Sequence, residues 1–213
     1  MLTGRSLSGR TLAEAWEAGL ELFRSPDHLY RHDSERGVAF EVPGLTLFVE
    51  SADDLALPAR YAYPSLVTEY AERVFGAERE TSLLHRRMHA WPTREGATLD
   101  QIAQATALLR SSPDTRAAAF SLWQPESEYA SDFPVSPVSG CFRVIDEAVH
   151  LLLVARSVDY WIGAVPELVV FARLLQKVAD DLRRRPGGLV YHAWSAHVYE
   201  DDCLVHLMAD GAP

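Results

Sequence analysis

The stretch RAAAFSLWQPESEYASDFPVSPVSGCFRV occupies residues 116–144 of this 213-residue chain. Its first part, Arg116–Trp123, is apolar enough to predict a buried β-strand. The next part, Gln124–Pro137, holds three prolines among polar residues, which is typical of a long functional loop. Val138–Ile145 then predicts a second strand. The stretch is therefore expected to place an exposed loop between two strands of a sheet.

Apolar periodicity predicts helices on both sides of this stretch. We expect an amphipathic helix over Thr11–Phe23, with Thr11 as its cap, and another over Pro64–Phe75. A third is expected over Thr98–Leu109, where Thr98 and Gln101 would form a capping box. A long, almost wholly apolar helix is expected over Val165–Leu182, and Pro186–Gly188 would stop it.

Further strands complete the predicted sheet. Val38–Glu50 alternates around Pro43-Gly44, which predicts either a strand pair or one bulged strand. Val149–Ser157 would pair with the strand before it through a turn at Asp146-Glu147, and Leu189–Tyr199 would be the last strand. The sum is a single α+β domain over residues 1–213, with a mostly β core and a few packed helices.

The composition argues against several classes of function. The chain carries 30 acidic and 20 basic residues, a net charge of −10, which disfavours non-specific binding to nucleic acid or anionic membrane. Cys141 and Cys203 belong to no CxxC pair or His/Cys cluster, so neither a metal site nor a disulfide framework is predicted. The N-terminus is too polar for a signal peptide, and no apolar run approaches a membrane span, so a cytoplasmic protein is expected.

Three segments together resemble the thymidylate synthase superfamily. HAWPTREGATLDQIAQATALLRSSPDTR, residues 89–116, is similar to its WP turn, helix and PDSRR motif. Residues 116–144 match the arginine pair, AWNP motif and catalytic-cysteine loop without a gap, and residues 155–202 resemble the RSxD motif, the following helix and the AHIYxN motif. The N-terminal part is more similar to short-form synthases and cytidylate hydroxymethylases. The resemblance implies the thymidylate synthase fold, a twisted mixed β-sheet sandwich with packed helices, and a homodimer with shared sites.

The resemblance also assigns catalytic positions. In this family a cysteine thiolate attacks C6 of a pyrimidine nucleotide, and C5 takes a one-carbon unit from 5,10-methylenetetrahydrofolate. The match puts Ser136 at the cysteine position and Pro137 at the neighbouring histidine position, while Cys141 lies at an odd strand offset and is a poor substitute. Ser136 is thus either a nucleophile or a loop serine that only hydrogen-bonds, and ordinary thymidylate synthesis is not expected. Glu69 matches a glutamate that assists proton transfer; the alternative is an exposed helix glutamate.

Several matched residues are implied to bind phosphate. Arg156 and Ser157 match the RSxD pair that contacts the nucleotide phosphate. Arg116 matches the first of two arginines that reach into the partner subunit's site, and the second is replaced by alanine. Arg36 is loosely similar to an N-terminal phosphate arginine. Guanidinium groups suit phosphate because they donate bidentately. The alternative for Arg156 is a structural ion pair with Asp159 or another acid.

Other matched residues are implied to bind base, sugar and cofactor. Glu167 replaces the asparagine that reads the uracil edge; a carboxylate cannot donate to O4, but it can accept from the 4-amino group of cytosine. The alternative is that Glu167 caps the helix. His197 and Tyr199 match the pair that contacts the sugar hydroxyl and share a strand face, with core packing as the alternative. Asp159 matches the folate-contacting aspartate.

These matches predict a folate-dependent one-carbon transferase, similar to a hydroxymethylase, in specialised nucleotide metabolism. Its pyrimidine nucleotide is expected to be cytidylate-like rather than dUMP. The alternative is a non-catalytic or repurposed relative that binds a nucleotide or a partner subunit. Neither reading involves a metal.

Overall fold

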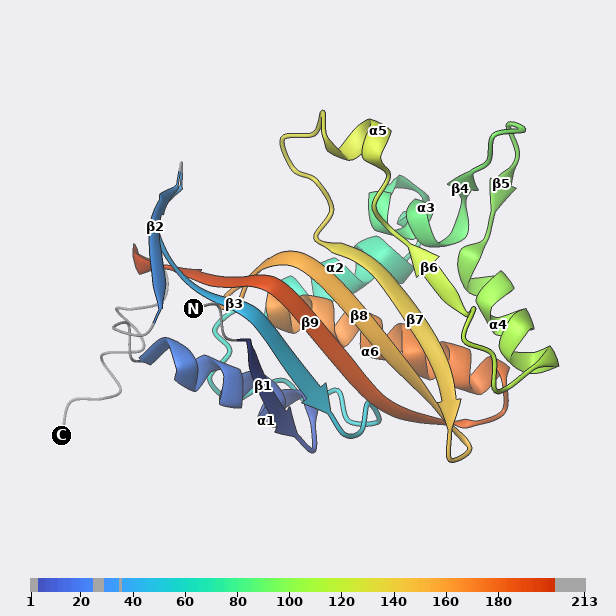
Figure 1. The fold of residues 1–213 in the computed structure, drawn as a ribbon, viewed down its shortest axis with the longest axis horizontal. Coiled ribbons are helices and arrows are strands. Elements are labelled where there is room, and N and C mark those ends of the chain that lie inside the picture. Colours follow the sequence, from blue (N-terminus) through green and yellow to red (C-terminus); the bar gives the residue numbers. More distant parts are fainter. Residues whose placement is uncertain (1–3, 25–28, 35, 202–213) are drawn as a thin grey trace.

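A mixed β-sheet forms the centre of the computed structural model, which describes residues 4–24, 29–34 and 36–201 (Figure 1). Seven strands make up the sheet in this part of the chain, in the order β1-β3-β9-β8-β7-β6, with β2 paired to β3. Their bounds are β1 (Arg5–Gly9), β2 (Tyr30–Ser34), β3 (Gly37–Val49), β6 (Ala119–Ser121), β7 (Pro137–Ile145), β8 (Ala148–Asp159) and β9 (Arg185–Tyr199). β1 pairs with β3, and β8 with β9, in parallel, and the other neighbours are antiparallel. The predicted α+β class is confirmed.

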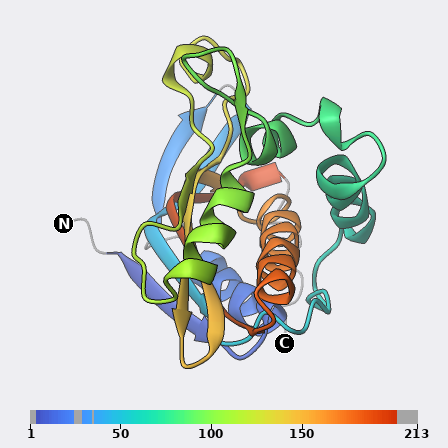
Figure 2. The same cartoon turned by 90° about the vertical axis from the view of Figure 1, so that its right-hand side faces the viewer.

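Helices pack against this sheet: α1 (Leu12–Leu20) on β1 and β3, α6 (Ala164–Asp181) on β8 and β9, and α3 (Leu83–His89) and α4 (Gln101–Ser111) beside β6. α2 (Pro64–Phe75) packs on α6, and α5 (Pro125–Glu128) belongs to the segment between β6 and β7. Figure 2 shows α6 lying against the sheet, with α2 on its outer side. Most of α6 is buried because apolar side chains surround its first turns. Trp16 on α1 fixes the end of β8: its Nε1 donates to the Tyr160 carbonyl oxygen at 3.0 Å, and the two rings stack.

Buried and less buried side chains alternate along β3, β9 and β8. In each of these neighbouring strands the alternation shifts by one residue, and the three shifts lie side by side. In β3 the large buried side chains have even numbers up to Val42 and odd numbers from Leu45, and the small side chain of Ala39 is buried as well. Gly44 lies between them with a φ of +69°, which a residue without Cβ adopts easily. β8 and β9 change in the same way around Arg156 and Trp194. Beyond these shifts, the odd-numbered side chains of both strands leave the core, and polar groups can gather there.

Most predicted elements are confirmed. The predicted helices Thr11–Phe23 and Val165–Leu182 correspond to α1 and α6, and Pro64–Phe75 is α2. Thr11 caps α1 by accepting from the Glu14 backbone N–H at 3.2 Å. Val38–Glu50 corresponds to one continuous strand rather than a pair, and its register with β9 does not shift at Gly44. The turn between β7 and β8 takes positive φ at both of its central residues.

Other boundaries were predicted wrongly. The capping box of Thr98 with Gln101 does not form, because Asp100 caps α4 by accepting from the Ala103 N–H at 2.8 Å. Thr98 instead belongs to β5 (Thr98–Leu99), which pairs with β4 (Trp91–Pro92). The predicted strand from residue 116 is shorter, because only Ala119–Ser121 pairs with β7.

The residues that stop the long helix were predicted wrongly, although its end was predicted to within one residue. α6 ends at Asp181, before the proline and glycines, and Arg183 turns the chain with a φ of 56°. Residues 186–188 lie inside β9, where pairing to β8 accommodates them. Cys203 and the rest of residues 202–213 lie outside the described residues.

Candidate functional site

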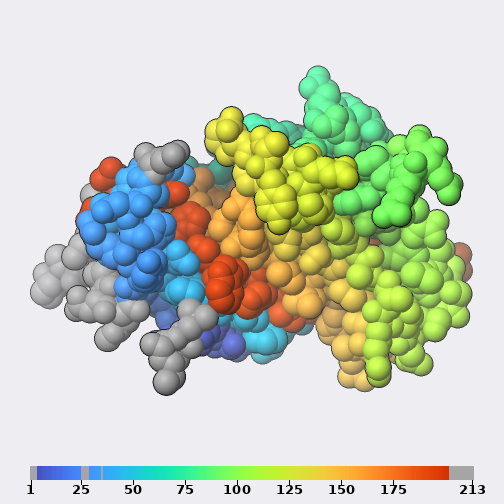
Figure 3. All heavy atoms as spheres, turned by 45° about the horizontal axis from the view of Figure 1, so that its top comes forward, coloured from blue at the N-terminus to red at the C-terminus, as the bar shows by residue number. Residues whose placement is uncertain are grey.

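Polar side chains gather where β8 and β9 end and where β7 begins, beside the segment 124–136 (Figure 1). Figure 3 shows this part of the surface, where orange and red atoms of the strands lie between the blue β2–β3 end and the yellow segment near residue 130. Three groups of contacts make up the region. We describe them as the loop cluster, the strand-end cluster and the carboxyl cluster.

The loop cluster is centred on the guanidinium of Arg156. Its Nε donates to the Val135 carbonyl oxygen at 3.1 Å, and one Nη donates to the Pro134 carbonyl oxygen at 2.7 Å. The other Nη donates to the Ser157 hydroxyl at 3.1 Å. A guanidinium has five N–H donors, so these contacts leave two. The alternative prediction was an ion pair between Arg156 and Asp159. In the structure Arg156 instead bonds the loop and holds it in place.

Ser136 completes the loop cluster. Its half-buried hydroxyl donates to the Ser157 carbonyl oxygen, and its own carbonyl oxygen accepts from the Arg156 N–H at 3.1 Å. Within the described residues, no histidine or carboxylate bonds to the Ser136 hydroxyl. The side chain is therefore held in place by main-chain groups rather than by a neighbouring base.

The strand-end cluster brings four predicted residues together. Nη1 of Arg36 lies 3.1 Å from Oδ2 of Asp159, and the guanidinium carbon lies 4.3 Å from the centroid of the Tyr199 ring. The rings of His197 and Tyr199 meet edge to face, with centroids 5.3 Å apart. Oδ1 of Asp159 also accepts from the Ile162 N–H at 3.0 Å. Residues that are more than 100 positions apart in sequence thus form one contact group.

Burial controls the charge of His197. Burial lowers the pKa of His197, and the carboxylates of Asp159 and Glu41 oppose this only in part. The imidazole is consequently neutral at pH 7. A neutral imidazole has one donor and one acceptor nitrogen, which suits contact with a hydroxyl group.

The carboxyl cluster is centred on Glu167, in the first turn of α6. Oε2 of Glu167 accepts a hydrogen bond of 2.7 Å from the Tyr191 hydroxyl. Burial raises the pKa of Glu167 to about 7, although the Tyr191 hydrogen bond and the charge of Arg156 both act to lower it. The carboxyl group bonds Tyr191 rather than the free N–H groups of the helix, so it does not cap α6. Glu167 can therefore change protonation state near neutral pH.

Sequence reasoning missed the two tyrosines of this cluster. Tyr191 lies on the α6 face of β9, which the alternation within the predicted strand Leu189–Tyr199 could have indicated. Tyr70 lies on α2, and burial followed by the charge of Glu167 raises its pKa. Its neighbour Glu69, the predicted proton-transfer residue, is exposed. The helix thus turns Tyr70, rather than Glu69, toward the carboxyl cluster.

Arg116 lies apart from these three clusters. It is exposed in the bend between α4 and β6. A role in the site of a partner subunit remains a prediction.

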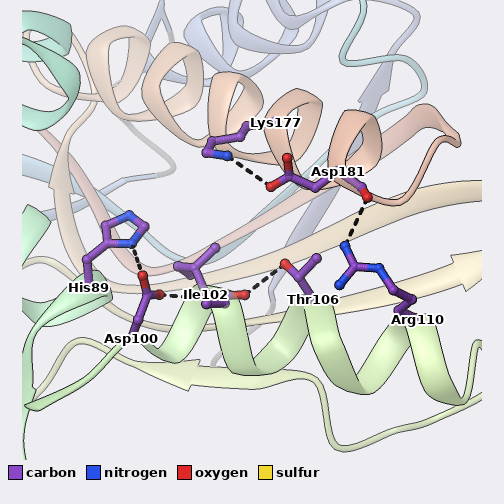
Figure 4. Close-up of a pocket in the computed structure, with 8 residues that line it drawn as sticks. His89, Asp100, Ile102, Thr106, Arg110, Lys177 and Asp181 are labelled. Carbon is purple, nitrogen blue, oxygen red and sulfur yellow. Dashed lines mark hydrogen bonds and ion pairs between the residues drawn. The ribbon is translucent and has the colours of Figure 1, made fainter.

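A separate surface pocket lies between α4 and α6 (Figure 4). Its charged side chains are paired: His89 Nδ1 lies 3.0 Å from Asp100, and Lys177 Nζ lies 2.9 Å from Asp181. Arg110 donates to the Asp181 carbonyl oxygen at 3.0 Å. These contacts join α3, α4 and α6, so the pocket is explained by helix packing.

Two negative findings apply to the described ranges. Within them, no group of three or more His, Cys, Asp or Glu side chains is arranged to hold a metal ion. No helix there has the length and apolar character that crossing a membrane requires.

Comparisons with known proteins fit this arrangement. The sequence profile described as thymidylate synthase matches residues 77–206, more than half of the chain. A protein of Methanococcoides burtonii named "Putative thymidylate synthase" is 28% identical over 209 residues, covering 93% of this chain and 91% of the relative. Proteins of the same name from Methanosarcina barkeri and Methanosarcina mazei are 26% and 27% identical over 205 residues, with the same coverage of both chains. The chain belongs to the thymidylate synthase family.

Proposed function

We propose that this protein transfers a one-carbon unit to C5 of a pyrimidine nucleotide with a 4-amino group, as a hydroxymethylase or methyltransferase of specialised nucleotide metabolism. The observation that carries the proposal is the buried carboxyl group of Glu167. It bonds Tyr191 at 2.7 Å and lies within electrostatic reach of Arg156. An ionised carboxylate only accepts hydrogen bonds, so it favours an amino group over a carbonyl oxygen. CMP and dCMP fit this preference better than dUMP.

The loop and strand-end clusters would hold the rest of the nucleotide. Arg156 keeps two N–H donors for a phosphate, beside the Ser157 hydroxyl. Arg36 supplies a second cation, next to the ring of Tyr199. His197 and Tyr199 would contact the sugar hydroxyl. Arg116 would complete the phosphate site of a partner subunit.

Ser136 is proposed to face C6 of the nucleotide. Glu69 is kept as the proposed residue that organises water for proton transfer, and from its exposed position on α2 it would have to act at a distance from the three clusters. Methylenetetrahydrofolate, when bound, would supply the one-carbon unit. Asp159 is proposed to hold it, since its carboxylate keeps lone pairs beyond those that accept from Arg36 and Ile162. No metal is invoked.

A homodimer is proposed because one face of the sheet exposes large apolar side chains. Phe48 and Leu152 both lie opposite Val190, so they share a face, and they are 43% and 42% exposed. Trp194, on the same strand as Val190, is 55% exposed. Tyr191 points to α6, so these side chains lie on the sheet face away from α6. Packing two such faces together would bury this surface. The cytoplasm remains the predicted location.

Release of tritium from C5 tests the proposed reaction. CMP, dCMP and dUMP labelled at C5 are incubated with the protein and methylenetetrahydrofolate. Release from CMP or dCMP, with little from dUMP, is expected. Preferential release from dUMP contradicts the proposed substrate class, and absence of release from all three contradicts the reaction.

A nucleotide-binding protein without a covalent step is the alternative function. The hydrogen bond from the Ser136 hydroxyl to the Ser157 carbonyl favours it, because that bond does not activate the serine. In that case, calorimetry should detect pyrimidine nucleotide binding while C5 tritium is retained. Ser136→Cys separates the two functions further: gain of tritium release means that the remaining groups are arranged for catalysis.

A further inference from the structure

The hydrogen bond between Tyr191 and Glu167 joins the sheet to the first turn of α6. Tyr191 is fully buried, and Glu167 is 8% exposed. We propose that Tyr191 is a positioning residue whose hydroxyl makes Glu167 select a pyrimidine with an amino group over one with a carbonyl oxygen at the same position. The inference rests on the proposed function and adds a residue that determines its specificity.

The geometry restricts what Glu167 can offer a ligand. Because the Tyr191 hydroxyl donates to Oε2 at 2.7 Å, that oxygen is engaged and the rotation of the carboxyl group is restricted. Oε1 is then the oxygen left for a base. In the ionised state it accepts from an amino group and repels a carbonyl oxygen. The tyrosine therefore occupies one acceptor site of Oε2 and leaves Oε1 as the carboxyl oxygen that is better placed to accept from a base.

The hydroxyl also stabilises the ionised state. Three other elements place titratable or charged groups near Glu167: Tyr191 on β9, Arg156 on β8 and Tyr70 on α2. Burial raises the pKa of Glu167 to about 7, and the Tyr191 hydrogen bond acts against that rise. Without the hydroxyl, the pKa of Glu167 would be higher and a larger fraction of the carboxyl group would be protonated at pH 7. A neutral carboxyl group has an O–H donor and can bond a carbonyl oxygen.

Binding of CMP and UMP to Tyr191→Phe tests the inference by calorimetry. The wild type should bind CMP more tightly, and the variant should lower the CMP-to-UMP affinity ratio by about tenfold, as expected for loss of a hydrogen bond to a charged group. Tyr160→Phe is the matched control, since Tyr160 is also fully buried and its hydroxyl donates to the Trp16 carbonyl oxygen at 2.9 Å. It should leave the ratio unchanged.

The pH dependence of the CMP-to-UMP affinity ratio is a second measurement. It would not change if Tyr191 served only to pack the core. The phosphate titration affects both nucleotides alike and cancels in the ratio. In the wild type, CMP preference should be lost as pH falls through about 7, where Glu167 becomes protonated. In Tyr191→Phe, the loss should occur at higher pH. An unchanged midpoint in the variant overturns the inference.

A second variant keeps the inference falsifiable if Tyr191→Phe does not fold. Glutamine cannot ionise, so Glu167→Gln should lose both the CMP preference and its pH dependence, and a retained preference overturns the inference. In the Glu167→Gln background, Tyr191→Phe should have little further effect on the ratio. If the wild type binds neither nucleotide, the proposed function fails, and the inference with it. If it binds CMP and Tyr191→Phe keeps the ratio, the inference alone fails.

Discussion

The side chains of Arg87 and Glu128 form an ion pair that is almost closed to solvent, with Nη2 and Oε1 2.8 Å apart and exposures of 8% and 1%. The other oxygen of Glu128 accepts from the Val135 N–H at 2.8 Å. Arg156 bonds the Val135 carbonyl oxygen from the other side. Both sides of Val135, the residue just before Ser136, are thus held in place. Arg156 bonds it directly, and Arg87 acts through Glu128.

Glu128→Ala should destabilise the protein by about 3–5 kcal/mol, because it leaves the buried charge of Arg87 and the Val135 N–H without their partner. Urea unfolding followed by tryptophan fluorescence measures the change. The double variant Arg87→Met/Glu128→Leu is the control, and it should recover much of the loss because it removes both charges. A loss below about 1 kcal/mol for Glu128→Ala would show that the pair is open in solution.

Glu167 should make stability depend on pH. Its folded pKa of about 7 lies above the ordinary value of 4.5, so its stabilising contribution is complete below about pH 4.5 and is lost as pH rises through about 7. The difference corresponds to roughly 3 kcal/mol. Glu167→Gln removes this dependence. Between pH 5 and 8, the free energy of unfolding of the wild type should therefore fall relative to that of the variant, and parallel curves would contradict the raised pKa.

The predictable part of the fold rests on local pattern. α6 follows from an apolar run long enough to be a helix, and the turn between β7 and β8 follows from the polar pair Asp146-Glu147 between two apolar strands, although of the two only aspartate is a residue type that favours positive φ. The four residues of the strand-end cluster were all proposed from resemblance, and the topology brings them into contact. Their roles toward a ligand remain predictions.

The unpredicted part rests on contacts between distant residues. Arg87 and Glu128 are of types that are usually exposed, and only the tertiary fold brings these residues of α3 and α5 together and buries them. Tyr191 lies in a predicted strand and Glu167 in a predicted helix. The hydrogen bond between them could not be predicted, because it depends on how α6 packs against β9. The cap of α4 was predicted at Thr98, but Thr98 pairs with Pro92 in the short strand β5, and Asp100 caps the helix instead.

Asp100→Ala should lower the free energy of unfolding by about 1 kcal/mol, because the Ala103 N–H loses its cap and His89 loses a carboxylate at 3.0 Å. Thr98→Ala is the matched control and should cost less, since Thr98 is exposed and does not cap α4. Chemical denaturation of both variants measures the difference. A larger loss for Thr98→Ala would restore the capping box that the sequence had predicted.

Trp194→Glu should convert the proposed dimer to a monomer. Trp194 is 55% exposed on the sheet face that also carries Phe48 and Leu152, and a glutamate there would be buried without a partner in a face-to-face dimer. Sedimentation velocity measures the mass of the particle. Tyr129→Glu is the control, because Tyr129 is 83% exposed in the segment before β7 rather than on this face, and it should remain dimeric. A wild-type monomer, or a Trp194→Glu dimer, would contradict the assignment of this face as the interface.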